Sequence, residues 1–170
     1  MATVMTATTV GPRRARTTDR RRKTPSQIAV VRTGGQFALI ATRFISGGQH
    51  VFRIEGIRTR RPTAFSVQIG ANRHIDIDRR LSLESQLDRY PWRFMNHSCD
   101  PNTMIDGQNV VAVRPIPAGE HLTFNYNTTE YDMAEPFTCQ CGSVFCGGVI
   151  RGYRHLTTEE RRRLDRLRSP

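Results

Sequence analysis

The stretch RFMNHSCDPN, at positions 93–102, decides how the rest of this sequence is interpreted. Six of its last seven residues carry polar or thiol side chains, and no apolar residues recur at the spacing of an amphipathic helix. Within it, Asp100-Pro101-Asn102 is typical of a turn. The pattern predicts a polar loop that presents its side chains to a ligand. The alternative is a surface turn whose Asn and Asp side chains cap their own backbone.

The composition indicates a single basic domain. A chain of 170 residues can form one domain with a sizeable core and short tails. Its formal net charge is +11, and its 26 basic residues include only one lysine, Lys23. This charge favours nucleic acid or acidic partners through general electrostatics, without indicating a mechanism.

The N-terminal region predicts neither export nor membrane insertion. No window approaches 18 consecutive apolar residues, and the N-terminus lacks the apolar core of a signal peptide. We therefore expect an intracellular protein, cytoplasmic or, in a eukaryote, nuclear, and not a secreted one. Residues 1–27 contain almost no large apolar side chains, which predicts a disordered basic tail. Its run RRRK at 20–23 indicates solvated charge, or else a nuclear-import or nucleic-acid contact.

Beyond the tail, the sequence favours a mainly β fold built from short sheets. Glycine-containing turns separate the β-rich runs, and βαβ alternation is absent, which argues against a Rossmann-type fold. Leu83 and Leu87 are compatible with a short helix. Thr157 and Glu160 have the spacing of a capping box, which predicts a basic C-terminal helix over 157–168. The predicted strands are 28–31, 37–41, 50–54, 64–69, 74–77, 109–114 and 121–126.

Three segments, in the same order, resemble the motifs of SET-domain protein-lysine N-methyltransferases with a post-SET zinc motif. The loop at 93–102 resembles Arg-Phe-x-Asn-His-Ser-Cys-x-Pro-Asn, and 116–126 is similar to I-x-x-G-E-E-L-T-F-D-Y. The stretch CQCGSVFC at 139–146 looks like the post-SET Cys-x-Cys-x4-Cys. The resemblance implies a SET domain at 28–127 and a post-SET zinc motif at 137–153.

The resemblance also implies a β-clip-like fold with a C-terminal pseudoknot. In this fold the strand at 121–126 and the polar loop thread past each other, which would bring Tyr126 beside Asn96. The sequence departs from the family at Phe37-Ala38, where the family has a glycine-rich turn that lets the backbone approach the cofactor.

For the cofactor, the resemblance implies S-adenosyl-L-methionine bound at the polar loop. Asn96 would hold its amino-acid end and the His97 backbone its adenine edge, while Arg93 and Phe94 would shape the pocket. Tyr126 would be the catalytic residue, because its hydroxyl would orient the lysine amine and lie against the methyl-sulfur group of the cofactor.

The proposed chemistry, methyl transfer from a sulfonium to an amine, is an in-line displacement that requires alignment, a deprotonated amine and a dry channel. A free lysine amine has a pKa of about 10.4, which desolvation beside a sulfonium lowers, so no dedicated general base is required. By resemblance, Phe124 lines the substrate channel with Tyr126. In the family, a tyrosine at that position limits the number of methyl groups that are added, whereas phenylalanine leaves more room. Phe124 therefore predicts di- or trimethylation.

The four cysteines predict a structural zinc ion. Cys139, Cys141 and Cys146 lie close together, and a tetrahedral zinc site needs a fourth ligand, for which Cys99 is the remaining thiol. Four thiolates leave no open position for water, so this zinc would be structural. Disulfides are the alternative, although a reducing compartment disfavours them.

Two functions other than protein-lysine methylation stay open at this point. A SET module that binds a protein partner without catalysis would fit the altered turn at Phe37-Ala38 and Asn125 in place of the family's Asp. A small basic zinc protein acting on nucleic acid would fit the charge, although residues 1–36 lack aromatic side chains that stack on bases. The leading interpretation is a methyltransferase for a lysine-containing protein, histone-like or other, with nucleic-acid contact through the tail as an option.

Overall fold

The fold is described by a computed structural model over residues 26–168, with side chains up to residue 166. The predicted tail at 1–27, with its RRRK run, lies outside this range apart from its last two residues. Of these, Gln27 is tied to the domain: its side-chain amide donates to the Val51 carbonyl and accepts from the Gln49 side chain. Gln27 therefore belongs to the folded part of the chain.

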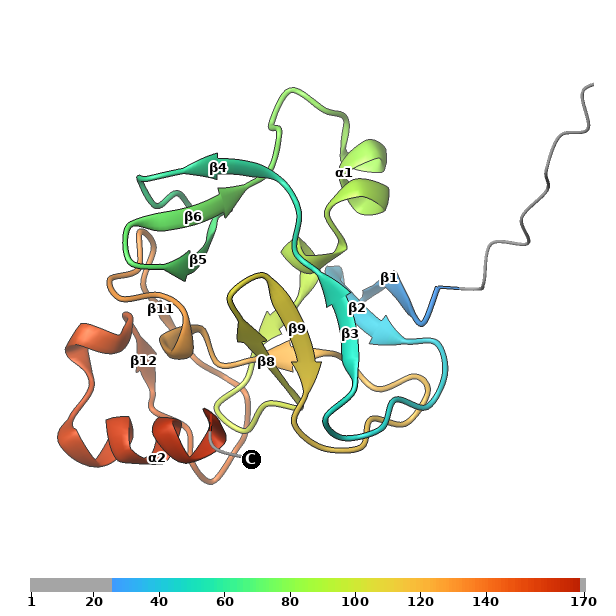
Figure 1. The fold of residues 1–170 in the computed structure, drawn as a ribbon. Coiled ribbons are helices and arrows are strands. Elements are labelled where there is room, and N and C mark those ends of the chain that lie inside the picture. The colour runs from blue at the N-terminus through green and yellow to red at the C-terminus, as the bar shows by residue number, and fades with distance from the viewer. Residues whose placement is uncertain (1–25, 169–170) are drawn as a thin grey trace, which may run out of the picture.

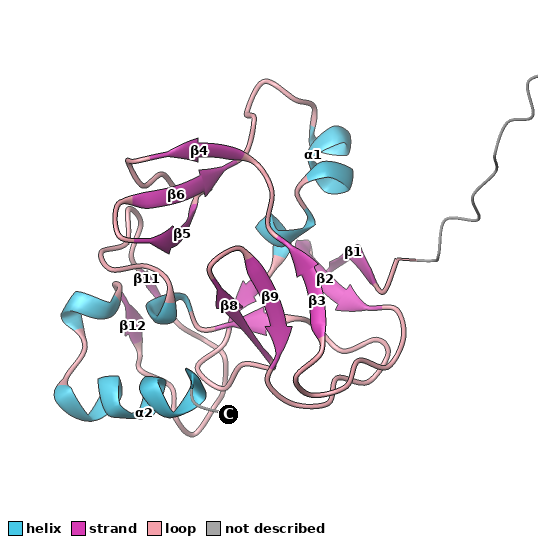
Figure 2. Cartoon of the chain, viewed as in Figure 1, coloured by secondary structure: helices cyan, strands magenta, loops and turns pink. Residues whose placement is uncertain are grey.

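Short strands form five small sheets across the described range, and the helices lie at its periphery (Figures 1 and 2). The sheet orders are β1-β2, β3-β9-β8, β4-β6-β5, β10-β7 and β11-β12. This confirms the mainly β fold. The strands are β1 Ile28–Thr33, β2 Gln36–Ala41, β3 His50–Arg53, β4 Ile57–Thr59, β5 Val67–Gly70, β6 Arg73–Asp76, β7 Asn96–His97, β8 Thr103–Asp106, β9 Asn109–Ala112, β10 Thr123–Phe124, β11 Phe137–Thr138 and β12 Val149–Ile150. The helices are α1 Leu83–Arg89 and α2 Thr158–Arg168, with 3₁₀ turns η1 Pro91–Phe94, η2 Tyr126–Thr128 and η3 Tyr153–His155.

The β1–β2 hairpin turns at two glycines. Gly34 and Gly35 have φ values of 59° and 83°, which suit a tight antiparallel hairpin and would strain other residues. Phe37 and Ala38 follow inside β2 and pair with β1 as ordinary strand residues. The backbone of this chain therefore does not require glycine at the two positions that depart from the family.

The core lies between β2, the β3–β9–β8 sheet and the segment that leads into β10. β9 runs antiparallel to both of its neighbours and buries alternate residues, as expected for a strand with one face on the core. Ile45 and Ile116 exchange two backbone hydrogen bonds of 2.9 Å, which join the loops after β2 and β9. The large apolar side chains with the least exposure in this core are Leu39, Ile45, Ile54, Ile75, Met95, Val110, Ile116 and Leu122.

The strand predicted at 64–69 begins later than the sequence indicated. Thr63 and Ser66 form a turn: the Thr63 N–H donates to Ser66 Oγ at 2.9 Å, and the Ser66 N–H donates to the Thr63 carbonyl at 3.3 Å. This local pairing competes with strand formation, so β5 starts at Val67. β4, which the sequence analysis did not predict, pairs with β6 on the other side of the same sheet.

The strand predicted at 121–126 is likewise shorter. β10 stops before Asn125, whose side chain accepts a hydrogen bond from the Asn127 N–H at 3.1 Å and so begins η2. Tyr126 is therefore presented by a tight turn and not by a strand. β8, also absent from the prediction, continues the sheet beyond β9.

Both helices begin with side-chain caps. The Ser82 hydroxyl accepts from the Ser85 N–H at 3.3 Å and starts α1. For α2 the predicted capping box is confirmed: the Glu160 N–H donates to Thr157 Oγ1 at 3.3 Å, and the Thr157 N–H donates to Glu160 Oε2 at 2.8 Å. Within residues 26–168, no helix has the length and apolar character needed to cross a bilayer.

A parallel pair of two-residue strands, β7 and β10, joins the polar loop to the segment before η2. Its register sets Phe124 opposite His97. The buried Asn102 strengthens the crossing, since its amide donates to the His121 carbonyl at 2.7 Å and its Oδ1 accepts from the Thr123 N–H at 2.9 Å. This crossing of distant segments is the pseudoknot that the resemblance implied.

Candidate active site and metal centre

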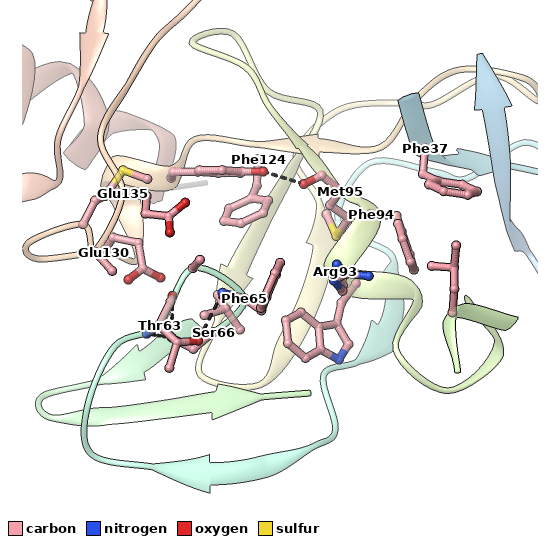
Figure 3. Close-up of a pocket in the computed structure, with 17 residues that line it drawn as sticks. Phe37, Thr63, Phe65, Ser66, Arg93, Phe94, Met95, Phe124, Glu130 and Glu135 are labelled. Carbon is pink, nitrogen blue, oxygen red and sulfur yellow. Dashed lines mark hydrogen bonds between the residues drawn. The ribbon is translucent and has the colours of Figure 1, made fainter. Parts of the chain in front are cut away.

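A pocket of about 390 Å³ opens between the polar loop, the turn before β5 and the segment after η2 (Figure 3). Most of its wall is apolar. The rings of Phe37 and Phe94 lie at one end, and the carboxylates of Glu130 and Glu135 lie at the other. The pocket therefore has an aromatic end and an acidic end, and Tyr126 is among the residues that line it.

The Tyr126 side chain is held by a hydrogen bond to the loop. Its hydroxyl donates to the Met95 carbonyl at 2.8 Å, the contact drawn as a dashed line in Figure 3. Its ring packs on Phe124 with centroids 4.6 Å apart. Burial, with a smaller effect of the nearby Glu130 carboxylate, raises the pKa of Tyr126 to about 12. The hydroxyl thus stays protonated, and its oxygen can accept a hydrogen bond from a ligand.

Of the predicted cofactor residues in the polar loop, Arg93 and Phe94 line the aromatic end of the pocket, whereas Asn96 and His97 lie outside its lining. The Asn96 amide donates to the Phe37 carbonyl at 3.3 Å, which joins the polar loop to β2. The rings of Phe37 and Phe94 meet edge to face at 5.4 Å. Arg93 lies over Phe94 and Phe65, at 5.2 and 4.7 Å, and donates to the Gln86 side chain at 3.0 Å. The substituted Phe37 thus forms part of the wall.

The ring of His97 bridges Tyr126 and Cys99. The Tyr126 N–H donates to Nδ1 at 3.2 Å, which makes Nδ1 the acceptor and leaves the proton of the neutral ring on Nε2. Nε2 lies 3.2 Å from Cys99 Sγ, in position to donate to it. Burial lowers the pKa of His97 to about 4, so the ring stays neutral. The side chain therefore orients Tyr126 and a thiol, a role that the sequence did not indicate.

The four cysteines converge on one point. The sulfurs of Cys99, Cys139, Cys141 and Cys146 lie within 4.8 Å of one another, and no pair is bonded as a disulfide. A tetrahedral site with Zn–S bonds of about 2.3 Å sets its sulfurs about 3.8 Å apart, and the Cys99–Cys139 separation is 4.0 Å. The Gly147 N–H donates to Cys99 Sγ at 3.4 Å. The donor set fits zinc, and cysteines 40 residues apart are brought together as predicted.

The acidic end of the pocket was not found by sequence analysis. Glu130 is only 8% exposed, although its surroundings NTTEYD look like an ordinary polar turn. Burial raises its pKa to about 7, against the opposing effects of hydrogen bonds from the Gln68 N–H and the Thr129 side chain. The partner Gln68 is 62 residues away in the chain, so no local pattern could have revealed this burial.

Part of the sequence is similar to curated proteins that are named as methyltransferases. Methyltransferase flvH of Aspergillus flavus is 44% identical over 67 residues, which cover 37% of this chain and 38% of that protein. A histone-lysine N-methyltransferase, H3 lysine-36 specific, of Chaetomium globosum is 44% identical over 68 residues, 35% of this chain and 8% of that protein. The chain thus spans less than two fifths of the length of either relative.

Solved structures resemble the fold. The crystal structure of KRYPTONITE in complex with mCHG DNA and SAH superposes with a TM-score of 0.54 at 20% identity, covering 72% of this chain and 28% of that chain. The SET domain family profile matches residues 36–127, a range that contains the polar loop, β10 and Tyr126. Because this match spans more than half of the sequence, the chain belongs to the SET domain family.

Proposed function

We propose that this chain is a protein-lysine N-methyltransferase that transfers a methyl group from S-adenosyl-L-methionine to a lysine ε-amine. The observation that carries the proposal is the pocket where the hydroxyl of Tyr126, the ring of Phe124 and the polar loop meet. The family match, the methyltransferase names of both relatives and the SAH in the KRYPTONITE complex support it.

In this proposal, the aromatic end of the pocket holds the cofactor, which supplies a methyl group on a sulfonium. Asn96 still has its side-chain oxygen available after donating to the Phe37 carbonyl, and that oxygen can accept from the cofactor's amino group. The His97 backbone is the proposed contact for the adenine edge. Arg93 and Phe94 hold the wall in shape through their mutual packing.

Catalysis by this pocket is proposed to rest on alignment and desolvation. The apolar wall excludes water, so a lysine amine that enters loses the hydration that favours its charged form. The Tyr126 oxygen accepts an N–H of the amine and sets its direction of approach, and alignment of this kind can contribute several kcal/mol to lowering a barrier. The neighbouring Phe124 has no hydroxyl, which leaves space for an amine that already carries methyl groups.

We assign residues 28–127 to a catalytic SET domain, 137–153 to a post-SET zinc segment and 157–168 to a supporting basic helix. The zinc would be structural, because four thiolates fill its coordination sphere. The Phe137 ring packs 5.7 Å from His97 and 5.9 Å from Tyr126. Through Phe137, the zinc segment would form one wall of the site.

The proposed substrate class is a lysine-containing protein. Because one relative is named for lysine 36 of histone H3, recombinant core histones are the first substrates to test. A histone substrate would imply a nuclear location in a eukaryote. Nucleic-acid contact through the basic tail at 1–27 is a further proposal, which rests on sequence alone.

Titration of zinc-loaded protein with S-adenosyl-L-methionine tests the proposed cofactor site directly. We expect saturable binding at one site by calorimetry, weakened about 10- to 100-fold in Asn96→Ala, since a hydrogen bond to a charged group contributes about 1.5–3 kcal/mol. The control is Asn72→Gly, which removes an exposed asparagine at φ 51°, a conformation that glycine adopts freely.

Histone methylation by the same preparation would then establish turnover. Binding without turnover on any histone would favour a protein-binding SET module, the alternative raised by the altered turn at Phe37-Ala38. Absence of binding at millimolar cofactor would contradict the proposed function.

Substitution of Phe124 by tyrosine is expected to shift the products toward monomethyl-lysine. The added hydroxyl would enter the channel beside Tyr126, occupy volume and accept a hydrogen bond from the amine. Mass spectrometry of the methylated substrate measures the product distribution. Phe65→Tyr, which adds a hydroxyl at the outer wall of the pocket, is the matched comparison. An unchanged distribution in Phe124→Tyr would refute the prediction of di- or trimethylation capacity.

A further inference from the structure

Glu130 is a buried carboxylate in the pocket that the chemistry above leaves unused. It follows Tyr126 by four residues, and its N–H donates to the Tyr126 carbonyl at 2.9 Å, so the turn of η2 fixes the two side chains relative to each other. Both side chains line the pocket together with Phe124. Figure 3 shows Glu130 and Glu135 at the end of the pocket opposite Phe37.

The Glu130 carboxylate is anchored on one side by β5. Its Oε1 accepts from the Gln68 N–H at 2.7 Å, and the Gln68 side chain in turn accepts from the Tyr131 N–H at 2.9 Å. These partners are neutral groups, so they hold the carboxylate in place and only partly offset the cost of burying its charge.

Glu130 forms no ion pair with any arginine or histidine in the part of the chain that the structure describes. Arg93, the one cationic side chain in the pocket lining, instead donates to the Gln86 side chain. Burying a carboxylate without a cation is unfavourable by several kcal/mol, which is reflected in its raised pKa of about 7. The site therefore favours a ligand that brings a positive charge into the pocket.

We propose that Glu130 receives the ammonium group of the substrate lysine and takes up its proton. This inference rests on the methyltransferase function proposed above and adds a proton acceptor to it. An N–H bond of the ammonium breaks, its electron pair stays on nitrogen and forms the new bond to the methyl carbon. The proton joins a Glu130 oxygen and passes to water when the product leaves. The sulfur retains the electron pair of the broken methyl–sulfur bond.

The variant Glu130→Gln tests this role because its side-chain oxygen can still accept from the Gln68 N–H. With a histone H3 peptide spanning lysine 36, we expect the wild-type kcat/KM to rise with pH through a pKa of about 7, because only the ionised carboxylate accepts a proton. In Glu130→Gln this inflection disappears, and kcat/KM at pH 7 falls by about 100-fold, as for loss of a general base. The kcat/KM of the variant then keeps rising with pH until the free amine is deprotonated, at a pKa of about 10.4.

Two further variants separate this role from a general effect of charge. The other titratable groups in the pocket lining are Tyr126, Glu135 and Arg93. Glu135→Gln removes a charge from the same end of the pocket, and we expect the inflection near pH 7 to remain. Asp132→Asn removes a charge from the same segment outside the pocket, where Asp132 pairs with Arg154, and should retain the wild-type profile.

A measurement without turnover makes the inference independent of the substrate chosen. In protein labelled with ¹³C at its glutamate carboxyl carbons, the Glu130 signal is assigned by its absence in Glu130→Gln. We expect it to titrate near pH 7, and n-butylammonium, which resembles a lysine side chain, should lower this pKa because a cation favours the carboxylate. Butanol should have no such effect.

The outcomes distinguish the two proposals. An unchanged pH profile in an active Glu130→Gln enzyme, or a Glu130 signal indifferent to butylammonium, would overturn the role of Glu130. If the wild type fails to bind S-adenosyl-L-methionine while the signal responds, the methyltransferase function is rejected and the amine site stands. Failure of both measurements would reject both proposals.

Discussion

The variant Tyr126→Phe is expected to transfer methyl groups about 100- to 1,000-fold more slowly than the wild type, the usual cost of removing one preorganised hydrogen-bonding group from an active site. The hydroxyl already donates to the Met95 carbonyl at 2.8 Å, which directs its oxygen as an acceptor for the substrate amine. Phenylalanine keeps the ring and its packing on Phe124. The rate is measured as methyl transfer to histones by mass spectrometry.

The folded state of Tyr126→Phe should persist, because the loss is a single hydrogen bond, which contributes about 1 kcal/mol to stability. Thermal unfolding and binding of S-adenosyl-L-methionine check this in the same preparation. The matched control is Tyr131→Phe, since Tyr131 is 58% exposed and lies outside the pocket. A Tyr126→Phe enzyme as fast as the wild type would exclude a catalytic role for this hydroxyl. A parallel loss of cofactor binding would assign it to binding instead.

The site residues that the sequence predicts are those whose chemistry requires a particular side chain at a particular spacing. The close spacing of Cys139, Cys141 and Cys146 predicts a metal site. Because a tetrahedral site needs a fourth ligand, the remaining thiol, Cys99, is the candidate. The pseudoknot was accessible only by resemblance, because no local pattern states that a two-residue strand at Asn96 pairs with one at Thr123.

The features that sequence analysis missed depend on contacts between distant residues. Glu130 is buried because β5 donates to it from 62 positions away, and its sequence neighbours are as polar as those of an exposed turn. The side chain of His97 bridges Tyr126 and Cys99, whereas its motif suggested only a backbone contact. Short strands such as β4 escape prediction for a related reason: three residues are too few to show the alternation of apolar and polar side chains that identifies a strand.

Removal of the metal is expected to stop methyl transfer by loosening residues 137–153, while the main core stays folded. Cys99 belongs to a small apolar cluster with Ile150 and Phe137, which adjoins the larger cluster that contains β9 only through Tyr126 among the apolar residues of these two clusters. Apparent binding free energies of structural zinc reach about 10–16 kcal/mol, far more than such a cluster can replace. Chelation should therefore remove hydrogen-exchange protection from 137–153 and leave that of β9.

The variant Cys99→Ser should reproduce the effect of chelation, because it removes one ligand and also the sulfur beside His97. Ser143→Ala, in the same loop but not a ligand, should bind one zinc and remain active. Colorimetric zinc release and hydrogen-exchange mass spectrometry follow metal and order separately, and readdition of zinc to chelated protein should restore the rate. A zinc-free protein with full activity would contradict this account. Loss of protection in β9 as well would mean that the metal supports the whole domain, because His97 connects the thiols directly to Tyr126 and β10.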